Sequence, residues 1–198
     1  MDDFIVKTAA FVKSAVSPRD LIRDGLPQVA FAGRSNVGKS SLLNTLANRR
    51  GLARTSGTPG RTREVNYFLI NGAFYFVDLP GYGYAKVSRS VSVAWKPLIE
   101  AYIRDNPALR VMIVILDARR VPGAEDLQLI EWLEAANVAY LPILTKRDKL
   151  TLNQFREQER KIRAALGFPD EVELAVFSAK TRLGREPLLN MIGELTAQ

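Results

Sequence analysis

Apolar stretches and helical patterns alternate along most of this 198-residue chain. Short runs rich in β-branched and aromatic residues predict strands, whereas apolar residues at three- and four-residue spacing predict helices that bury one face. The predicted strands occupy residues 28–32, 65–70, 73–77, 111–116, 138–144 and 172–177. The predicted helices occupy residues 41–48, 124–136 and 151–166, with a last helix that has Pro187 in its first turn and ends near Thr196. Such alternation indicates an α/β fold.

Local signals support two of these elements. The dipeptide Asn71-Gly72 joins two apolar runs and is typical of a hairpin with a type I′ turn. Thr151 and Gln154 have the spacing of a capping box, which predicts a helix that begins just after Thr151. The chain therefore contains one antiparallel strand pair among connections that otherwise suit a parallel sheet.

We expect a three-layer α/β domain over residues 23–198 and an N-terminal extension over residues 1–22. Its sheet should be six-stranded and mostly parallel, with one antiparallel edge strand. Right-handed crossovers place the loops that follow parallel strands on one rim, where ligands bind. The motifs that suggest chemistry all follow predicted strands, so this rim is the expected site.

The first motif reads Gly-Arg-Ser-Asn-Val-Gly-Lys-Ser and is a complete Walker A phosphate loop. Glycines let the backbone approach phosphate oxygens, and the amides at the start of the following helix point at the anion. Lys39 should reach the β- and γ-phosphates, and the Ser40 hydroxyl should bind Mg²⁺. The residues expected to bind nucleotide here are Gly33, Arg34, Ser35, Asn36, Val37, Gly38, Lys39 and Ser40.

The second motif, Asp-Leu-Pro-Gly, ends the second strand of the predicted hairpin. Asp78 is placed to hold Mg²⁺ through water, and the Gly81 amide is placed to sense the γ-phosphate. Read alone, the tetrapeptide is a Pro-Gly turn; its position at a strand end favours the phosphate-binding role. The residues assigned to nucleotide binding are Asp78, Leu79, Pro80 and Gly81.

Two further motifs, Thr-Lys-Arg-Asp at residues 145–148 and Ser-Ala-Lys at residues 178–180, follow the last two predicted strands and indicate guanine. The Asp148 carboxylate can accept hydrogen bonds from N1–H and the 2-amino group of guanine, donors that adenine lacks. The Lys146 stem would lie along the base, and an amide at or near Ala179 would bind O6. Each motif alone also fits a solvated turn, and their order gives them weight. The expected binding residues are Thr145, Lys146, Arg147, Asp148, Phe177, Ser178, Ala179 and Lys180.

Composition limits the chemistry. The sequence contains no cysteine and no histidine, so catalysis must use carboxylates, hydroxyls, cationic side chains, backbone amides or a hard metal ion. A formal charge of +7 favours polyanionic partners. No apolar run approaches the roughly 18 residues of a membrane span, and the first residues lack a signal-peptide pattern. We expect a cytoplasmic monomer with no membrane partner.

Together these motifs resemble those of the EngB/YihA/YsxC GTPases, which belong to the Era- and TrmE-related class of bacterial GTPases. The resemblance rests on residues 33–40, 60–62, Asn66, 78–85, 145–148 and 178–180, and it covers about residues 25–195. The run Asp-Leu-Pro-Gly-Tyr-Gly-Tyr-Ala is its most specific part. It implies a Ras-like phosphate-loop GTPase domain that acts in large ribosomal subunit assembly, bound to rRNA and ribosomal proteins, and is needed for cell division and septation.

The resemblance also adds site residues. It implies that Gly60, Arg61 and Thr62 bind nucleotide, with Thr62 contacting Mg²⁺ and the γ-phosphate as the first-switch threonine. The expected metal ligands are then Ser40, Thr62 and Asp78, and the expected catalytic residues are Lys39, Thr62 and Gly81.

The hydrolysis step carries two further expectations. Ras-type GTPases orient the attacking water with a glutamine at the position of Tyr82, so we expect slow intrinsic turnover and a switch-like function. In the related class an asparagine at the position of Asn36 can coordinate K⁺, so Asn36 either binds K⁺ or only shapes the loop. Two other functions stay open from sequence alone: a phosphate-loop kinase that uses ATP, and a non-catalytic GTP-gated adaptor in division.

The segment 51–64 is rich in arginine and contains one acidic residue, Glu64. Arg49 and Arg50 come just before it. We expect this segment to contact rRNA phosphates when GTP orders it, although a solvated loop would have the same composition.

Overall fold

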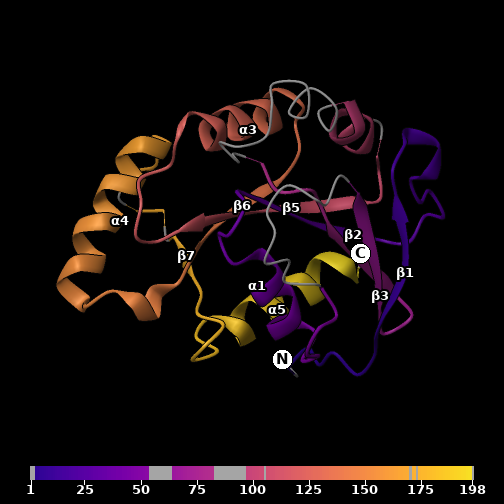
Figure 1. The fold of residues 1–198 in the computed structure, drawn as a ribbon, viewed down its shortest axis with the longest axis horizontal. Helices are drawn as coiled ribbons and strands as arrows, with labels where there is room; N and C mark the ends of the chain where they lie inside the picture. The colour runs from indigo at the N-terminus through magenta and orange to yellow at the C-terminus, as the bar shows by residue number, and fades with distance from the viewer. Residues whose placement is uncertain are drawn as a thin grey trace.

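A twisted β-sheet forms the centre of the molecule (Figure 1). The computed structural model describes residues 3–53, 64–82, 97–104, 106–169, 171–172 and 174–197. Within these residues the sheet has seven strands in the order β1-β3-β4-β2-β5-β6-β7. The strands are β1 (Ala9–Ala15), β2 (Gln28–Gly33), β3 (Val65–Ile70), β4 (Phe74–Asp78), β5 (Leu109–Asp117), β6 (Tyr140–Thr145) and β7 (Ala175–Val176).

The strand directions confirm a mostly parallel sheet. β2 runs parallel to β4 and β5, β5 to β6, and β6 to β7, whereas β3 is antiparallel to β4. The expected count of six strands was wrong because β1 adds a seventh, antiparallel to β3, which moves β3 away from the edge. β1 lacks a clear apolar–polar alternation: Phe11 and Val12 are 55% and 43% exposed. Backbone pairing, rather than burial of one face, therefore defines this edge strand.

Helices cover both faces of the sheet (Figure 1). α1 (Lys39–Leu46) and α5 (Arg185–Thr196) pack on one face. On the other face lie α3 (Ala124–Ala135), α4 (Leu152–Leu166) and a helix over residues 97–103. Successive residues of β5 enter the two cores alternately, as the pleat requires, so the predicted three layers are confirmed. Within the described residues, no helix has the length and apolar character needed to cross a membrane.

The turn and the helix start predicted from local signals are confirmed. Asn71 and Gly72 both have positive φ, 52° and 68°, as a type I′ turn requires. The Thr151 hydroxyl accepts from the Gln154 amide at 3.3 Å, and the Gln154 side chain accepts from the Thr151 amide at 3.0 Å. Short 3₁₀ turns follow β1 (Pro18–Asp20) and β6 (Arg147–Lys149). The last strand, expected over residues 172–177, comprises only Ala175–Val176.

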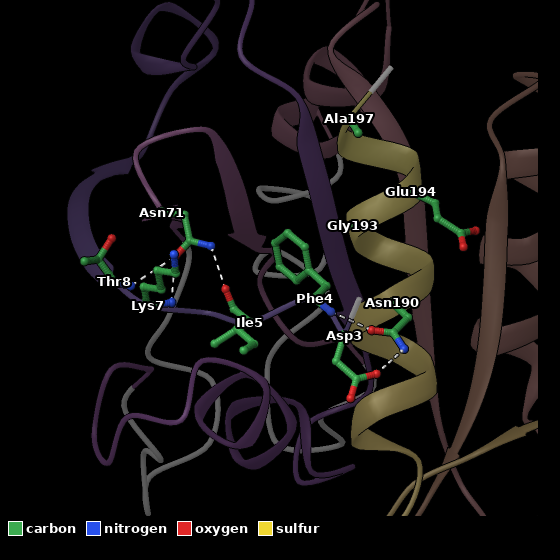
Figure 2. A pocket seen from close by; sticks show the side chains of 10 residues that line it. All are labelled: Asp3, Phe4, Ile5, Lys7, Thr8, Asn71, Asn190, Gly193, Glu194 and Ala197. Atoms are coloured by element: carbon green, nitrogen blue, oxygen red, sulfur yellow. Dashed lines mark hydrogen bonds between the residues drawn. The ribbon is translucent and has the colours of Figure 1, made fainter. Parts of the chain in front are cut away.

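The segment before β1 runs between the β3–β4 turn and α5 and borders an open groove (Figure 2). The Asn71 side-chain oxygen accepts from the amides of Lys7 and Thr8 at 2.7 and 3.0 Å. The amide of Phe4 donates to the Asn190 side chain of α5 at 2.8 Å. The hairpin turn therefore also anchors the residues that lead into the edge strand.

The start of α5 offers a test of packing beneath β7. Gly184, the N-cap, has φ of 76°, and an added Cβ would lie 2.0 Å from the carbonyl oxygen of Val176. We expect Gly184→Ala to lower the free energy of unfolding by at least about 2 kcal/mol, since left-handed strain and a backbone clash add together. The matched control is Gly25→Ala, where φ is 86° and no atom lies within 4 Å; it should cost about 1 kcal/mol. Urea denaturation measures both, and equal losses would contradict the clash.

Candidate nucleotide site

The loops that follow the parallel strands meet at one edge of the sheet, as expected. The phosphate loop follows β2, the Asp-Leu-Pro-Gly turn follows β4, and the two guanine-type loops follow β6 and β7. A fifth loop, which follows the end of β5 at Asp117, joins them. The site is thus assembled from segments far apart in sequence by the parallel part of the sheet.

The phosphate loop has the backbone conformation of an anion-binding nest. Asn36 and Gly38 have left-handed φ values of 66° and 108°, and α1 begins immediately afterwards at Lys39. Residues of alternating handedness turn successive N–H groups toward one concavity. The first-turn amides of α1 have no partner within their own helix, and the helix dipole places positive charge there. The loop is therefore shaped to bind phosphate.

Lys39 and Asp78 meet at the mouth of this loop. The Lys39 ammonium donates a hydrogen bond to the Asp78 carboxylate. Both side chains are largely buried, at 12% and 10% exposure. The phosphate-loop lysine and the acid that ends β4 thus converge on one point, where the terminal phosphates of a nucleotide and a metal ion would lie.

The Asp-Leu-Pro-Gly turn is joined to the phosphate loop through the backbone. The Ser35 amide donates to the Tyr82 carbonyl at 2.9 Å, and the Tyr82 amide donates to the Gly33 carbonyl at 3.4 Å. A Cβ at Gly81 would lie 3.2 Å from the Ser35 hydroxyl oxygen. The turn therefore packs directly on the loop, and Gly81 lies at the contact.

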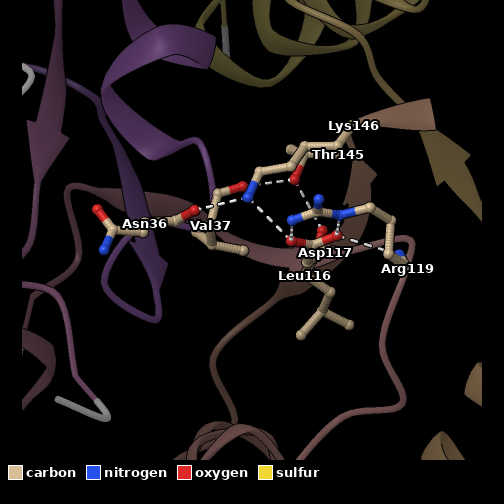
Figure 3. Close-up of polar contacts among 7 residues, drawn as sticks. All are labelled: Asn36, Val37, Leu116, Asp117, Arg119, Thr145 and Lys146. Atoms are coloured by element: carbon tan, nitrogen blue, oxygen red, sulfur yellow. Dashed lines mark hydrogen bonds and ion pairs between the residues drawn. The ribbon is translucent and has the colours of Figure 1, made fainter. Parts of the chain in front are cut away.

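The loop after β6, which contains Thr145 and Lys146, also binds the phosphate loop (Figure 3). The Lys146 ammonium donates to the Asn36 carbonyl at 2.7 Å, and the Thr145 hydroxyl donates to the Val37 carbonyl at 2.7 Å. The Leu116 carbonyl lies 2.9 Å from the same hydroxyl, whose single hydrogen the two carbonyls share. Thr145 is buried and fully engaged, so its side chain supports the loop. The aliphatic stem of Lys146 lies across Gly38: a Cβ added to this glycine would lie 3.9 Å from Lys146 Cε.

The aspartate expected to read guanine is oriented by the second guanine-type loop. The Ser178 hydroxyl donates to Asp148 Oδ1 at 2.7 Å and accepts from the Thr181 amide at 3.2 Å. Ser178 is fully buried, whereas Asp148 is exposed at the rim. This bond joins the loops after β6 and β7 at the position where a base would be recognised.

Three predicted binding residues direct their side chains elsewhere. Leu79 and Phe177 are 2% and 1% exposed and belong to the two cores. The Arg147 guanidinium lies 4.3 Å from the centre of the Phe155 ring on α4 and donates to the Leu150 carbonyl at 2.8 Å. Only the backbone of these three residues is available to the site. Gly60, Arg61 and Thr62 lie outside the described residues.

Sequence reasoning missed Asp117, the last residue of β5, and Arg119, which follows it. The Asp117 carboxylate accepts from Lys146 Nζ at 2.9 Å and from Arg119 Nη2 at 2.8 Å (Figure 3). Burial alone would raise the pKa of Asp117, but hydrogen bonds from Arg119 and Lys146 hold that pKa below its usual value. Asp117 therefore remains ionised near neutral pH and fixes Lys146. The available signal was a carboxylate at the end of a buried apolar run.

A sheet edge that holds an anion-binding loop beside an aspartate oriented for guanine is characteristic of GTP-binding proteins of the phosphate-loop class. Residues 28–146 match the family model described as 50S ribosome-binding GTPase. The chain is 50% identical over 187 residues to a probable GTP-binding protein EngB from Syntrophotalea carbinolica, covering 94% of this chain and 90% of that relative. It is 43% identical to the Clostridium perfringens strain 13 relative of the same description, covering 94% and 95%.

Solved structures agree. A crystal structure of a probable GTP-binding protein engB matches with a TM-score of 0.70 and 25% identity, over 86% of this chain and 98% of that one. Era in complex with MgGDPNP and a 16S ribosomal RNA segment shares the fold, with a TM-score of 0.66 and 22% identity over 85% of this chain and 56% of that one. The chain belongs to the EngB family of GTP-binding proteins, and it is a GTPase.

The position of Asp117 generates a prediction about nucleotide binding. Asp117→Asn removes the carboxylate that fixes Lys146, so we expect GDP to bind about tenfold more weakly, the usual effect of losing a charged hydrogen bond. Titration with fluorescently labelled GDP measures the change. Glu157→Gln on α4 is the control, because it breaks an exposed ion pair with Lys161 away from the site. Unchanged affinity in the Asp117 variant would show that Lys146 is fixed without it.

Proposed function

We propose that this GTPase is a molecular switch in the assembly of the large ribosomal subunit, acting in the cytoplasm, and that cell division and septation depend on it through that role. The match to the 50S ribosome-binding GTPase family carries the proposal. The surface charge supports it: Arg49 and Arg50 are exposed just after α1, and Arg182 Nη2 donates to the side chain of neighbouring Asn48 at 2.9 Å. These exposed cations suit rRNA phosphates, and the sequence adds the arginines of segment 51–64, which lie outside the described residues.

The chain supplies the parts for binding and neutralising a nucleoside triphosphate. The nest amides and Lys39 would hold the β- and γ-phosphates, and the Lys39 charge would offset negative charge that develops as the terminal phosphoryl group leaves. The amide of Gly81 would contact the γ-phosphate, and Asp148 would accept the guanine N–H groups. Gly60, Arg61 and Thr62 complete the proposed site as the first switch.

The donors near Lys39 fit Mg²⁺. A serine hydroxyl and a carboxylate, from Ser40 and Asp78, are hard oxygen donors, and Thr62 would add a third in the GTP state. Within the described ranges no group of three or more carboxylate, imidazole or thiolate side chains could hold a metal alone. That pattern suits Mg²⁺, which usually binds one or two protein ligands together with substrate phosphates. When bound, the ion would neutralise phosphate charge.

Tyr82 explains why intrinsic turnover should be slow. Its side chain is 5% exposed, and its hydroxyl donates to Asp126 Oδ1 at 2.9 Å. A side chain held in the core in this way does not orient an attacking water. The group that polarises the water therefore has to come from elsewhere, and we propose K⁺ held by the exposed side chain of Asn36.

The K⁺ role predicts a cation-dependent rate. Single-turnover GTP hydrolysis should be about tenfold or more faster in potassium than in sodium buffer, because the ion would stabilise transition-state charge as an arginine finger does. Asn36→Gly keeps the left-handed backbone and removes the side-chain oxygen. It should abolish the difference while GDP still binds. Equal hydrolysis rates for the wild type in the two buffers would contradict the K⁺ role.

Co-sedimentation with large ribosomal subunits tests the switch itself. Binding should be stronger with a non-hydrolysable GTP analogue than with GDP or without nucleotide. If about four phosphates are contacted, affinity should fall about a hundredfold as salt rises from about 50 to about 200 mM. Arg49→Ala/Arg50→Ala should lower the salt slope, whereas Arg156→Ala/Arg160→Ala on exposed positions of α4 should not.

Two results would redirect the proposal. Binding that ignores both nucleotide and salt would contradict a GTP-controlled contact with rRNA. GTP-dependent capture of division proteins without stimulated turnover would instead favour the adaptor function.

A further inference from the structure

Tyr82 connects the end of the Asp-Leu-Pro-Gly turn to helix α3. It follows Gly81 directly, and its side chain passes into the core beneath α3. Its hydroxyl donates to Asp126 Oδ1 at 2.9 Å, and Asp126 is only 3% exposed. Burial and the neighbouring Asp126 raise the pKa of Tyr82 well above its ordinary value, so the hydroxyl stays a donor.

Asp126 is itself held in place from two directions. Its Oδ2 accepts from the Gly123 amide at 2.8 Å, and Arg34 Nη1 of the phosphate loop lies 4.0 Å from the same oxygen. Tyr82 is thus fixed at both ends: its backbone pairs with the phosphate loop, and its hydroxyl binds a carboxylate anchored on α3. The short chain between Asp78 and Tyr82, which contains Gly81, has little freedom to shift.

Packing alone does not account for this bond. A phenylalanine would fill the same space, whereas a buried carboxylate is costly unless it is hydrogen-bonded. The hydrogen bond between Tyr82 and Asp126 lies one residue from Gly81, the glycine expected to contact the γ-phosphate. The hydrogen bond therefore restricts where the Gly81 amide points, a restriction that matters for a triphosphate and not for a diphosphate.

We propose that Tyr82 and Asp126 are positioning residues for the GTP state: their hydrogen bond holds the Gly81 amide against the phosphate loop, so that the protein distinguishes GTP from GDP. This inference rests on the proposed role of Gly81. It assigns to Tyr82 a function in place of the water-orienting one, and it extends the nucleotide-sensing apparatus to α3.

Nucleotide competition on the intact chain tests the proposal. Tyr82→Phe should bind a non-hydrolysable GTP analogue about tenfold more weakly and leave GDP affinity unchanged. Asp126→Ala should have the same effect, and the double variant should lose no more than either single one, because both remove the same bond. Asp126→Asn, which keeps an oxygen for the Tyr82 hydroxyl, should restore most of the GTP preference.

Tyr140→Phe is the matched control. It removes another tyrosine–carboxylate bond to α3, between Tyr140 and Glu134, away from the phosphate loop. Its ratio of GTP-analogue to GDP affinity should equal that of the wild type. Urea unfolding of every variant identifies any that are not folded; should Tyr82→Phe fail to fold, the comparison of Asp126→Ala with Asp126→Asn decides.

Two outcomes would overturn the inference: an unchanged affinity ratio in Tyr82→Phe and Asp126→Ala, or equal losses for both nucleotides. Gly81→Ala separates this from the role of Gly81 itself. If Gly81→Ala loses GTP preference while the Tyr82 and Asp126 variants keep it, the positioning role is wrong and the Gly81 role stands. If Gly81→Ala also keeps it, although the added Cβ would lie 3.2 Å from the Ser35 hydroxyl oxygen and so displace the amide, the proposed γ-phosphate contact is wrong.

Discussion

The phosphate loop keeps its shape because neighbouring loops bind its carbonyl groups. Lys146 and Thr145 donate to the carbonyls of Asn36 and Val37, and the chain after β4 pairs with Gly33 and Ser35. With the Asn36 and Val37 carbonyls engaged by these side chains, the amides at the start of α1 are left for an anion. A loop that a ligand would otherwise have to organise is thereby preorganised, which lowers the entropic cost of binding.

This arrangement couples the loop expected to bind the base to the loop expected to bind phosphate. Lys146 contacts the phosphate loop and Asp117 at the same time, so a side chain assigned to the base also supports the phosphate cradle. Its backbone is left-handed, with φ of 60°, a conformation that costs energy in a non-glycine residue and is kept where the surroundings enforce it. The ion pair with Asp117 supplies that enforcement, and Arg119 fixes the carboxylate by donating to both of its oxygens.

Sequence alone predicted features that are set by nearest neighbours. The type I′ turn at Asn71 and the cap at Thr151 each depend on a few adjacent residues, so their residue types suffice. Sequence alone failed for β1, where pairing with a distant strand defines the element, and for Asp117, whose partner Lys146 lies 29 residues away. The helix over residues 97–103 was also missed, although Leu98, Ile99 and Tyr102 are buried at helical spacing.

The motifs predicted which loops meet at one edge of the sheet better than they predicted what each side chain does there. Leu79 and Phe177 fill cores, and the Arg147 side chain lies against α4, although all three belong to nucleotide motifs. A motif constrains the path of the backbone, so side chains at some motif positions can pack in the core instead of facing the ligand. Asp126 shows the converse. It belongs to no motif, yet its hydrogen bond with Tyr82 connects it to the residue next to Gly81.

The contact between Phe4 and Asn190 has a consequence for how the chain is made. These residues are 186 positions apart, yet a hydrogen bond joins them, and the Phe4 ring occupies the space beside Gly193. Because synthesis is vectorial, Phe4 stays without this partner until α5 has been made. Docking of residues 3–5 on α5 therefore has to follow the formation of that helix.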